Sequence, residues 1–202
     1  MQTLKLFGLA ALILMLSAST PLKYDIGDSV ADFNLKNFDG NMVSLSSYKD
    51  VKGVIVIFDC NTCPYSKAYN DRIIGLNKKY ATQGFPVMTI NANDPEMSPG
   101  DSFEEMALRA RQKKYDFPYL IDESQTVARA FGATNTPHVF VLQKAGEGFK
   151  VAYKGTIDNN SRDASSVTKR YVEDAVDALI AGKTIETKTT KAIGCGIKWR
   201  NS

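Results

Sequence analysis

Two cysteines separated by two residues are the most reactive side chains in the sequence. Cys60 and Cys63 follow an unbroken apolar run at residues 54–58 and directly precede Pro64. Such a run is typical of a buried parallel strand, and proline is favoured in the first turn of a helix. The free N–H groups and the dipole of a helix N-terminus stabilise a thiolate. We therefore predict a redox pair in which Cys60 attacks and Cys63 is the resolving thiol.

Other roles for the two cysteines remain open on the residues alone. A structural disulfide between Cys60 and Cys63 would close a very small loop and constrain the unfolded chain little. With Cys195 and the sole histidine, His138, they make four soft ligands, enough for a zinc or copper site. Cys195 lies in a C-terminal tail and His138 begins a predicted strand, so the sequence does not bring the four together. We expect no metal and no cofactor, and we expect His138 to be a partly buried strand residue.

The third cysteine, Cys195, has two interpretations. It could be a third redox thiol that reaches Cys60 when the tail folds back, or a free, buried cysteine that acts as a small hydrophobic side chain. Gly194 and Gly196 allow close packing of the backbone in either case. The second interpretation is slightly favoured, and Cys195 is predicted to be at most a modulator of the pair. Trp199 is expected to anchor the tail to the domain.

The first residues have the plan of a secretory signal peptide. Lys5 precedes an apolar run at residues 6–16, and small residues follow it. The run is too short for a comfortable membrane span. We expect cleavage of residues 1–19, an uncleaved N-terminal anchor being the alternative. Residues 20–202 would then form one exported domain with a C-terminal tail, periplasmic or extracellular if the source is bacterial. Disulfides persist in such compartments.

Composition is that of one ordinary globular domain. The 202 residues are 44% hydrophobic, enough to bury a core without metal or disulfide support. The net charge is +3 and the 25 lysines and arginines are scattered along the chain. We therefore expect no nucleic-acid partner and no stable insertion of the mature chain into a membrane.

Apolar patterns along the chain alternate between strands and helices. A hairpin is expected at residues 31–45, around Asp39-Gly40. The helix after Pro64 would leave Asn70 and Asn77 on its solvent face, and the next helix would take Asp101 or Ser102 as its N-cap. Strands are expected at residues 54–58, 86–90, 117–121, 138–143 and 149–157, and helices at residues 64–80, 101–115, 124–131 and 167–182. The alternation indicates an α/β domain with a largely parallel central sheet.

Several of these segments also resemble a known family. FDCNTCPYSKAYNDRI, INANDPE, DSFEEM, FPYLIDESQTVARAFGATNTP, YKGTID and IGCGIKW are similar to the thioredoxin-like redoxins related to alkyl hydroperoxide reductase and thiol-specific antioxidant (AhpC/TSA) proteins. The resemblance runs from about Asp25 to Trp199. It implies a thioredoxin-like fold, a central mixed sheet flanked by helices with an N-terminal β-hairpin. It also places Cys60 and Cys63 at the active-site pair.

The same resemblance implies a substrate-binding loop at Thr136 and Pro137. The peptide bond between these two residues would be cis and would face the cysteine pair. The backbone of Thr136 would then be free to form a short β-bridge with a bound substrate chain.

Two departures from neighbouring families refine the expected activity. Asp59 stands where thioredoxins carry tryptophan, and a carboxylate beside Cys60 should disfavour its thiolate. The Pro-x-x-x-Thr/Ser-x-x-Cys loop of peroxiredoxins fits neither cysteine. Counted back from Cys60, its hydroxyl position is Ile57, and counted back from Cys63 it is Cys60.

We therefore predict an exported thiol–disulfide oxidoreductase, working as a reductase. Its partners would be a disulfide-containing protein or small thiol and a thiol electron donor. A thiol-dependent peroxidase is the first alternative, and a copper- or zinc-binding chaperone of the same fold is the second.

Overall fold

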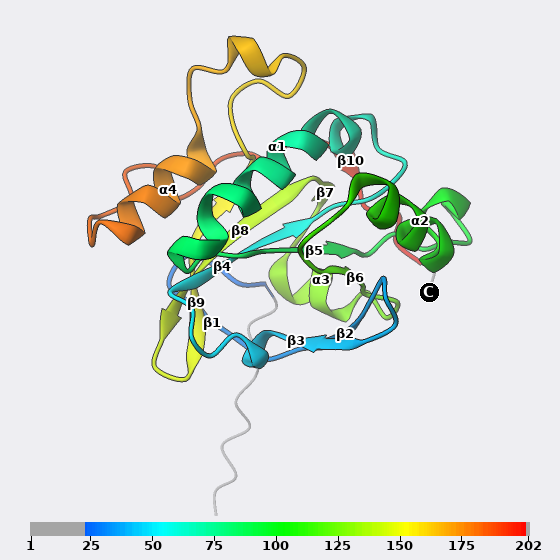
Figure 1. Cartoon of the computed structure of the whole chain (residues 1–202), viewed down its shortest axis with the longest axis horizontal. Helices are drawn as coiled ribbons and strands as arrows, with labels where there is room; N and C mark the ends of the chain where they lie inside the picture. The colour runs from blue at the N-terminus through cyan, green and yellow to red at the C-terminus, as the bar shows by residue number, and fades with distance from the viewer. Residues whose placement is uncertain (1–22, 201–202) are drawn as a thin grey trace, which may run out of the picture.

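An eight-stranded mixed sheet forms the middle layer of the protein (Figure 1). The computed structural model describes residues 23–200, so the predicted signal peptide, residues 1–19, lies outside the described residues. The strands follow one another across the sheet in the order β1 (Ser29–Val30), β9 (Gly148–Gly155), β8 (His138–Ala145), β4 (Gly53–Phe58), β5 (Val87–Asn91), β6 (Tyr119–Ile121), β2 (Asn34–Asn37) and β3 (Met42–Ser44).

Most neighbouring strands of this sheet run antiparallel. Within residues 23–200, only the β4–β5 and β5–β6 pairs are parallel. The expectation of a largely parallel sheet was therefore wrong, because hairpins extend the sheet on both sides of this parallel centre. The mixed sheet that the family resemblance implied is confirmed, as is the hairpin β2–β3, and β8 and β9 form a second hairpin.

Helices cover both faces of the sheet (Figure 1). β4 alternates between two hydrophobic clusters, with Ile55 and Ile57 facing one and Val56 and Phe58 facing the other. α1 (Pro64–Tyr80) and α4 (Tyr171–Ile180) pack on the first face, α3 (Thr126–Phe131) packs on the second, and α2 (Phe103–Lys113) packs against β6. Short 3₁₀ turns lie at Leu45–Ser47, Ala81–Gln83, Pro99–Asp101 and Ala164–Ser166. No helix in the described range 23–200 could span a bilayer.

The helix that follows the cysteine pair begins at Pro64, as predicted. Its solvent face was predicted wrongly, because Asn70 and Asn77 are both buried. Asn77 Oδ1 accepts a hydrogen bond of 3.0 Å from the backbone N–H of Val87. Burying an asparagine side chain costs little free energy when its amide group is hydrogen-bonded. The polar character of these two residues therefore did not show whether they are buried or exposed.

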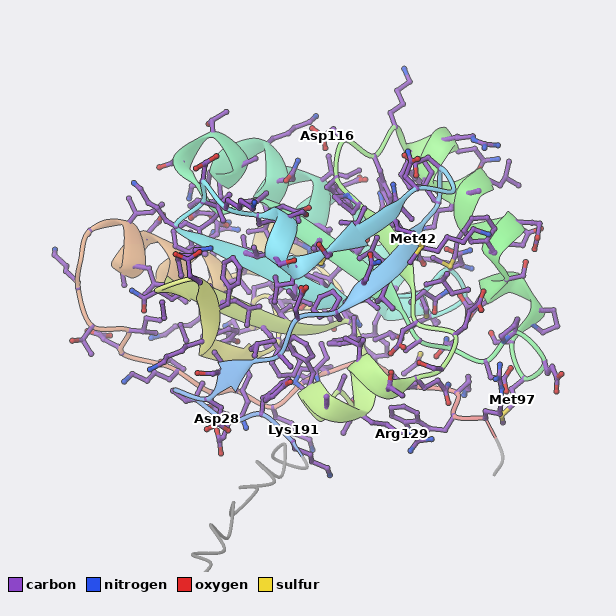
Figure 2. All side chains as sticks on the ribbon, turned by 90° about the horizontal axis from the view of Figure 1, so that it is seen from below. Asp28, Met42, Met97, Asp116, Arg129 and Lys191 are labelled. Atoms are coloured by element: carbon purple, nitrogen blue, oxygen red, sulfur yellow. The ribbon has the colours of Figure 1, made fainter. Side chains whose placement is uncertain are left out.

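The C-terminal tail returns to the domain and adds a short strand. β10 (Cys195–Gly196) pairs antiparallel with β7 (Asn135–Thr136), outside the main sheet. Further along the tail, Trp199 packs against the core, and the Arg129 guanidinium lies 4.5 Å from the centre of its ring. Figure 2 shows Arg129 projecting from α3 on this side of the molecule. The predicted role of Trp199 as an anchor is confirmed.

The strand that carries the cysteine pair requires a glycine at its first residue. A Cβ atom at Gly53 would lie 2.2 Å from the carbonyl oxygen of Leu142, whereas a Cβ at Gly75, exposed in the middle of α1, would meet no atom within 4 Å. We expect Gly53→Ala to lower the free energy of unfolding by about 1–3 kcal/mol through overpacking. Gly75→Ala should raise it by about 0.5–1 kcal/mol. Denaturant unfolding measures both, and a Gly53→Ala variant as stable as the wild type would contradict this packing.

Candidate active site

The three cysteines of the chain meet at one point. Cys60 follows the end of β4, Cys63 is the residue that caps the N-terminus of α1, and Cys195 lies in β10. The sulfur atoms of Cys63 and Cys195 are 2.7 Å apart. Cys60 and Cys63 are linked through Thr136, which contacts both sulfur atoms. All three are free thiols, with Cys63 in the middle.

Thr136 contacts both members of the pair. Its hydroxyl oxygen lies 3.1 Å from the sulfur of Cys60, and its carbonyl oxygen lies 3.0 Å from the sulfur of Cys63. The peptide bond to Pro137 is cis, as the family resemblance implied. The position of Thr136 and Pro137 beside the pair is thus as expected.

The backbone of Thr136, however, is not free. Cys195 pairs with Thr136 as an antiparallel β-partner. It thus takes the place in which a substrate chain was expected to bind. The tail can approach Thr136 closely because Gly194 has no side chain. A Cβ atom at Gly194 would lie 2.1 Å from the Thr136 carbonyl oxygen. The prediction of an open binding edge was wrong for this conformation.

A buried carboxylate holds the loop between the cysteines. Asp101 accepts hydrogen bonds from the backbone N–H groups of Asn61 (2.6 Å) and Thr62 (3.2 Å), and from the Thr62 hydroxyl (2.7 Å). Its side chain is fully buried, and Ser102 rather than Asp101 is the N-cap of α2. From the sequence, Asp101 was predicted only as a possible helix cap, because a capping Asp and a buried Asp that binds a distant loop look alike in sequence.

Asp59 is paired with an arginine that the sequence analysis did not identify. Arg109 Nη2 lies 3.2 Å from Asp59 Oδ2, and Nη1 donates to the carbonyl oxygen of Cys60. Among the described residues, Asp59 Oδ1 has no hydrogen-bond partner. Burial raises the pKa of Asp59, and the charge of Arg109 opposes this shift. A signal did exist, since Arg109 follows Met106 by three residues and so falls on the buried face of its helix.

The electrostatics of the pair favour a thiolate on Cys63. The hydrogen bond from Cys60 is the main factor that lowers the pKa of Cys63 to about 4, and hydrogen bonds from Cys195 and from the Ser66 backbone add to it against the cost of burial. The hydrogen bond with Cys63, burial and the charges of Asp101 and Asp59 raise the pKa of Cys60. The Ser66 backbone N–H in the first turn of α1 adds to the shift at Cys63, whereas the prediction placed Cys60 at the helix N-terminus. The two differ because α1 begins only at Pro64.

Cys195 also differs from its favoured interpretation. Its side chain is partly exposed, whereas Cys60 and Cys63 are 1% and 3% exposed. Burial and the contact with Cys63 raise its pKa to about 11. The tail does fold back onto the pair, but Cys195 contacts Cys63 rather than Cys60.

His138 is the first residue of β8 and is buried, as expected of a strand residue. Its Nδ1 atom accepts a hydrogen bond of 3.3 Å from the backbone N–H of Thr134. Burial, which disfavours the charged ring, lowers its pKa to about 4. Residues 23–200 contain no group of three or more His, Cys, Asp or Glu side chains arranged to hold a metal ion.

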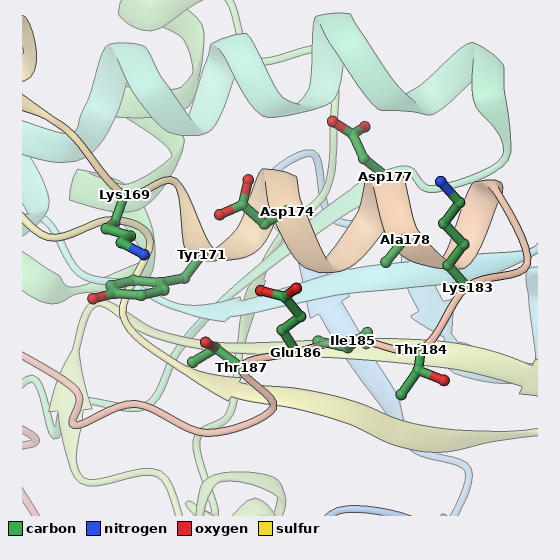
Figure 3. A pocket seen from close by; sticks show the side chains of 10 residues that line it. All are labelled: Lys169, Tyr171, Asp174, Asp177, Ala178, Lys183, Thr184, Ile185, Glu186 and Thr187. Atoms are coloured by element: carbon green, nitrogen blue, oxygen red, sulfur yellow. The ribbon is translucent and has the colours of Figure 1, made fainter.

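A separate hollow of about 420 Å³ lies between α4 and the segment that follows it (Figure 3). Its lining mixes basic side chains such as Lys169 and Lys183 with the acidic Asp174, Asp177 and Glu186. No cysteine lines it, and its charges have no common sign. We therefore assign the chemistry to the cysteines.

Comparison with known proteins identifies related sequences and structures. The sequence profile of the AhpC/TSA family matches residues 26–152. Thiol-disulfide oxidoreductase ResA of Halalkalibacterium halodurans is 26% identical over 125 residues. That match covers 62% of this chain and 66% of the relative, slightly less than two thirds of its length.

Solved structures extend the similarity over most of the chain. An uncharacterised conserved protein of Geobacillus kaustophilus is 35% identical with a TM-score of 0.81, and the match covers 89% of this chain and 94% of that one. An exposed lipoprotein thioredoxin of Streptococcus pneumoniae is 22% identical with a TM-score of 0.55, covering 75% and 99% of the two chains. At this identity the second match demonstrates the shared fold only.

Removing the arginine of the buried pair should destabilise the fold. Arg109→Met leaves the Asp59 carboxylate buried without its partner, which typically costs about 3–5 kcal/mol. Arg111→Met, at an exposed position of the same helix, should change stability by less than about 0.5 kcal/mol. Denaturant unfolding measures both changes. The double variant Asp59→Asn/Arg109→Met should recover part of the loss, and an Arg109→Met variant of wild-type stability would disprove the coupling.

The buried imidazole should make the fold less stable in acid. The folded-state pKa of His138, about 4, is lower than the ordinary histidine value of 6.5, so the unfolded chain binds the proton more tightly. Stability from this residue is complete above pH 6.5 and falls as the pH drops towards 4, by about 3 kcal/mol in total. Between pH 6.5 and pH 4, the free energy of unfolding of the wild type should therefore fall by about 3 kcal/mol more than that of His138→Gln.

The pKa of His138 itself is directly measurable. As the sole histidine, it should give a single imidazole titration by NMR. A midpoint at or above 6.5 would refute the assigned burial.

Proposed function

Because the chain belongs to the AhpC/TSA family and has the thioredoxin fold, we propose that it is a thiol–disulfide oxidoreductase acting through Cys60 and Cys63. The observation that carries this proposal is that Thr136 contacts both sulfurs, Cys60 at 3.1 Å and Cys63 at 3.0 Å, with Cys63 at the N-cap position of α1. A thiolate held beside a second thiol is the arrangement that disulfide exchange requires. The name of the ResA relative supports the same activity.

In the proposed mechanism, Cys63 attacks rather than Cys60. The Cys63 thiolate forms a bond to one sulfur of a substrate disulfide, and the other substrate sulfur leaves as a thiolate. Cys60 then loses its proton and attacks the sulfur of Cys63. This step forms the Cys60–Cys63 disulfide and releases the second substrate thiolate, so two electrons pass from the pair to the substrate. The roles are the reverse of those that the sequence suggested, because the pKa is lowered at Cys63.

Asp59 and Asp101 contribute by keeping the proton on Cys60. The neighbouring Cys63 side chain and burial raise the pKa of Cys60 most, and the charges of both carboxylates add to the shift, so Cys60 keeps its proton at neutral pH. This fits the modulating role that was predicted for Asp59. Thr136 and Pro137 form the wall against which the substrate sulfur would lie.

The direction of electron flow depends on how strongly the dithiol form is favoured. The reductase direction was predicted from Asp59 acting alone against the helix dipole. Arg109 now partly compensates the charge of Asp59, and a stabilised Cys63 thiolate moves the couple towards oxidising potentials. The geometry thus supports disulfide exchange and removes the main argument for a dedicated reductase.

The remaining features of the proposal come from the sequence. The signal-like plan of residues 1–19 supports export to a periplasmic or extracellular compartment. A disulfide-containing protein or a small thiol would be the substrate, and a thiol electron donor would restore the pair.

A peroxidase is less well supported by the site. Such enzymes activate peroxide with a hydroxyl group and a free arginine beside the reactive thiol. The Thr136 hydroxyl is near Cys60, but the hydrogen-bonding groups of Arg109 already bind Asp59 and the Cys60 carbonyl oxygen. We therefore expect peroxide to be consumed no faster than by an exposed thiol.

Trapping of the substrate adduct tests the proposal and the assigned roles. With glutathione disulfide, the double variant Cys60→Ser/Cys195→Ser should retain one glutathione on Cys63, because no thiol remains to release it. Cys63→Ser/Cys195→Ser should carry no adduct and should not reduce insulin. Intact mass after acid quenching reads the adduct. An adduct on Cys60 in Cys63→Ser/Cys195→Ser would restore the sequence-based roles. Wild-type protein that neither reduces insulin nor forms a Cys60–Cys63 disulfide would refute the oxidoreductase activity.

A further inference from the structure

Cys195 has a partner sulfur that the pairwise mechanism does not use. We propose that Cys195 is a second resolving thiol, which forms an intramolecular disulfide with Cys63 as an alternative to Cys60. This inference rests on the proposed function, because it assigns a third member to the same redox centre. The substrate class is unchanged, and the tail becomes part of the catalytic machinery.

The backbone geometry places Cys195 against Cys63. β10 pairs with β7 in the register that sets Cys195 opposite Thr136, the residue that contacts both other thiols. The Cys63 and Cys195 sulfurs are 2.7 Å apart, so little movement separates them from a covalent bond. Cys63 therefore has a thiol on each side.

Polar side chains of the domain hold the tail in place. The Asn93 side chain accepts a hydrogen bond of 2.9 Å from the Lys198 N–H, and the Gln125 side chain donates to the Lys198 carbonyl oxygen (2.9 Å). Both side chains are buried. Asn135 Nδ2 also donates to the carbonyl oxygen of Gly194 (2.9 Å). Contacts on both sides of Cys195 thus fix its position over the pair.

Exposure gives the third thiol a role that the pair fills less well. Cys60 and Cys63 are almost completely buried, whereas Cys195 is partly exposed. While the tail is docked, a disulfide between Cys60 and Cys63 is therefore less accessible than one that includes Cys195. A disulfide between Cys63 and Cys195 places one sulfur where the thiol of an electron donor can attack it.

The proposed steps conserve atoms and electrons. After Cys63 has formed a mixed disulfide with the substrate, the Cys195 thiolate attacks the Cys63 sulfur. The Cys63–Cys195 bond forms and the substrate thiolate leaves. Alternatively, Cys195 attacks the Cys63 sulfur of a Cys60–Cys63 disulfide, and Cys60 leaves as a thiolate that takes up the proton lost by Cys195. This second step moves the disulfide towards the surface without net oxidation.

Peptide mapping distinguishes the two disulfides. Trypsin leaves Cys60 and Cys63 together in residues 53–67 and Cys195 in residues 192–198. The protein would be equilibrated in a glutathione redox buffer, quenched in acid, alkylated and digested. A Cys63–Cys195 bond links the two peptides, whereas a Cys60–Cys63 bond stays within one.

The cysteine variants have distinct expected products. Wild-type protein should give both products, Cys195→Ser only the bond within one peptide, and Cys60→Ser only the linked peptides. Cys63→Ser should give no linked peptides. Two results would overturn the proposal and leave the oxidoreductase activity intact. One is the presence of linked peptides in Cys63→Ser. The other is two free thiols in Cys60→Ser while the wild type still forms the Cys60–Cys63 disulfide. Absence of any intramolecular disulfide from wild type would instead refute both.

Two glycines beside Cys195 provide a matched pair that keeps all three thiols. A Cβ at Gly194 would collide with the Thr136 carbonyl group, whereas a Cβ at Gly196 would meet no atom within 4 Å. Gly194→Ala should lower the yield of linked peptides about tenfold, equivalent to about 1.4 kcal/mol of lost docking. Gly196→Ala should give the wild-type yield, and equal yields from the two variants would contradict the docked geometry. Circular dichroism verifies that both variants are folded.

Discussion

The contact of Thr136 with the two cysteines of the pair is the feature on which the rest of the site depends. Its hydroxyl group contacts Cys60, its carbonyl oxygen contacts Cys63, and its backbone pairs with the strand that carries Cys195. These contacts come from elements that are far apart in the chain. The main sheet brings them together because β8, which begins just after Pro137, lies beside β4 in the register that sets His138 opposite Phe58. The loop of Thr136 therefore reaches the end of the strand that leads to Cys60.

The neighbouring thiol, burial and the buried charges around this contact together decide which thiol ionises. Asp101 holds the loop between the cysteines, and Asp59 lies directly before it. Negative charge on that side disfavours a thiolate on Cys60, while the N-terminus of α1 favours one on Cys63. Arg109 keeps the burial of Asp59 tolerable by pairing with it. The same groups thus hold the loop and polarise the pair.

The elements around the cysteine pair could be predicted from sequence because their signals are local. The apolar run of β4, the proline at the start of α1 and the turn at Asp39-Gly40 each report the conformation of a few neighbouring residues. β10 could not be predicted in this way, because two residues are too few to show an alternating pattern of apolar and polar side chains. The strand exists only because Thr136 lies beside it. Arg109 and Asp101 were missed for a related reason. Their partners lie about 40 to 50 residues earlier in the chain, so no local pattern indicates them.

The account as a whole requires that Cys63 be the ionised thiol of the reduced protein. The most direct measurement is the ultraviolet absorbance of thiolate as a function of pH, compared between the wild type and the three single Cys→Ser variants. We predict one thiolate in the wild type that forms with a pKa of about 4, far below the ordinary cysteine value of 9.0. This transition should persist in Cys195→Ser and disappear in Cys63→Ser. A transition that survives in Cys63→Ser but is lost in Cys60→Ser, or the absence of any thiolate below neutral pH, would contradict the account.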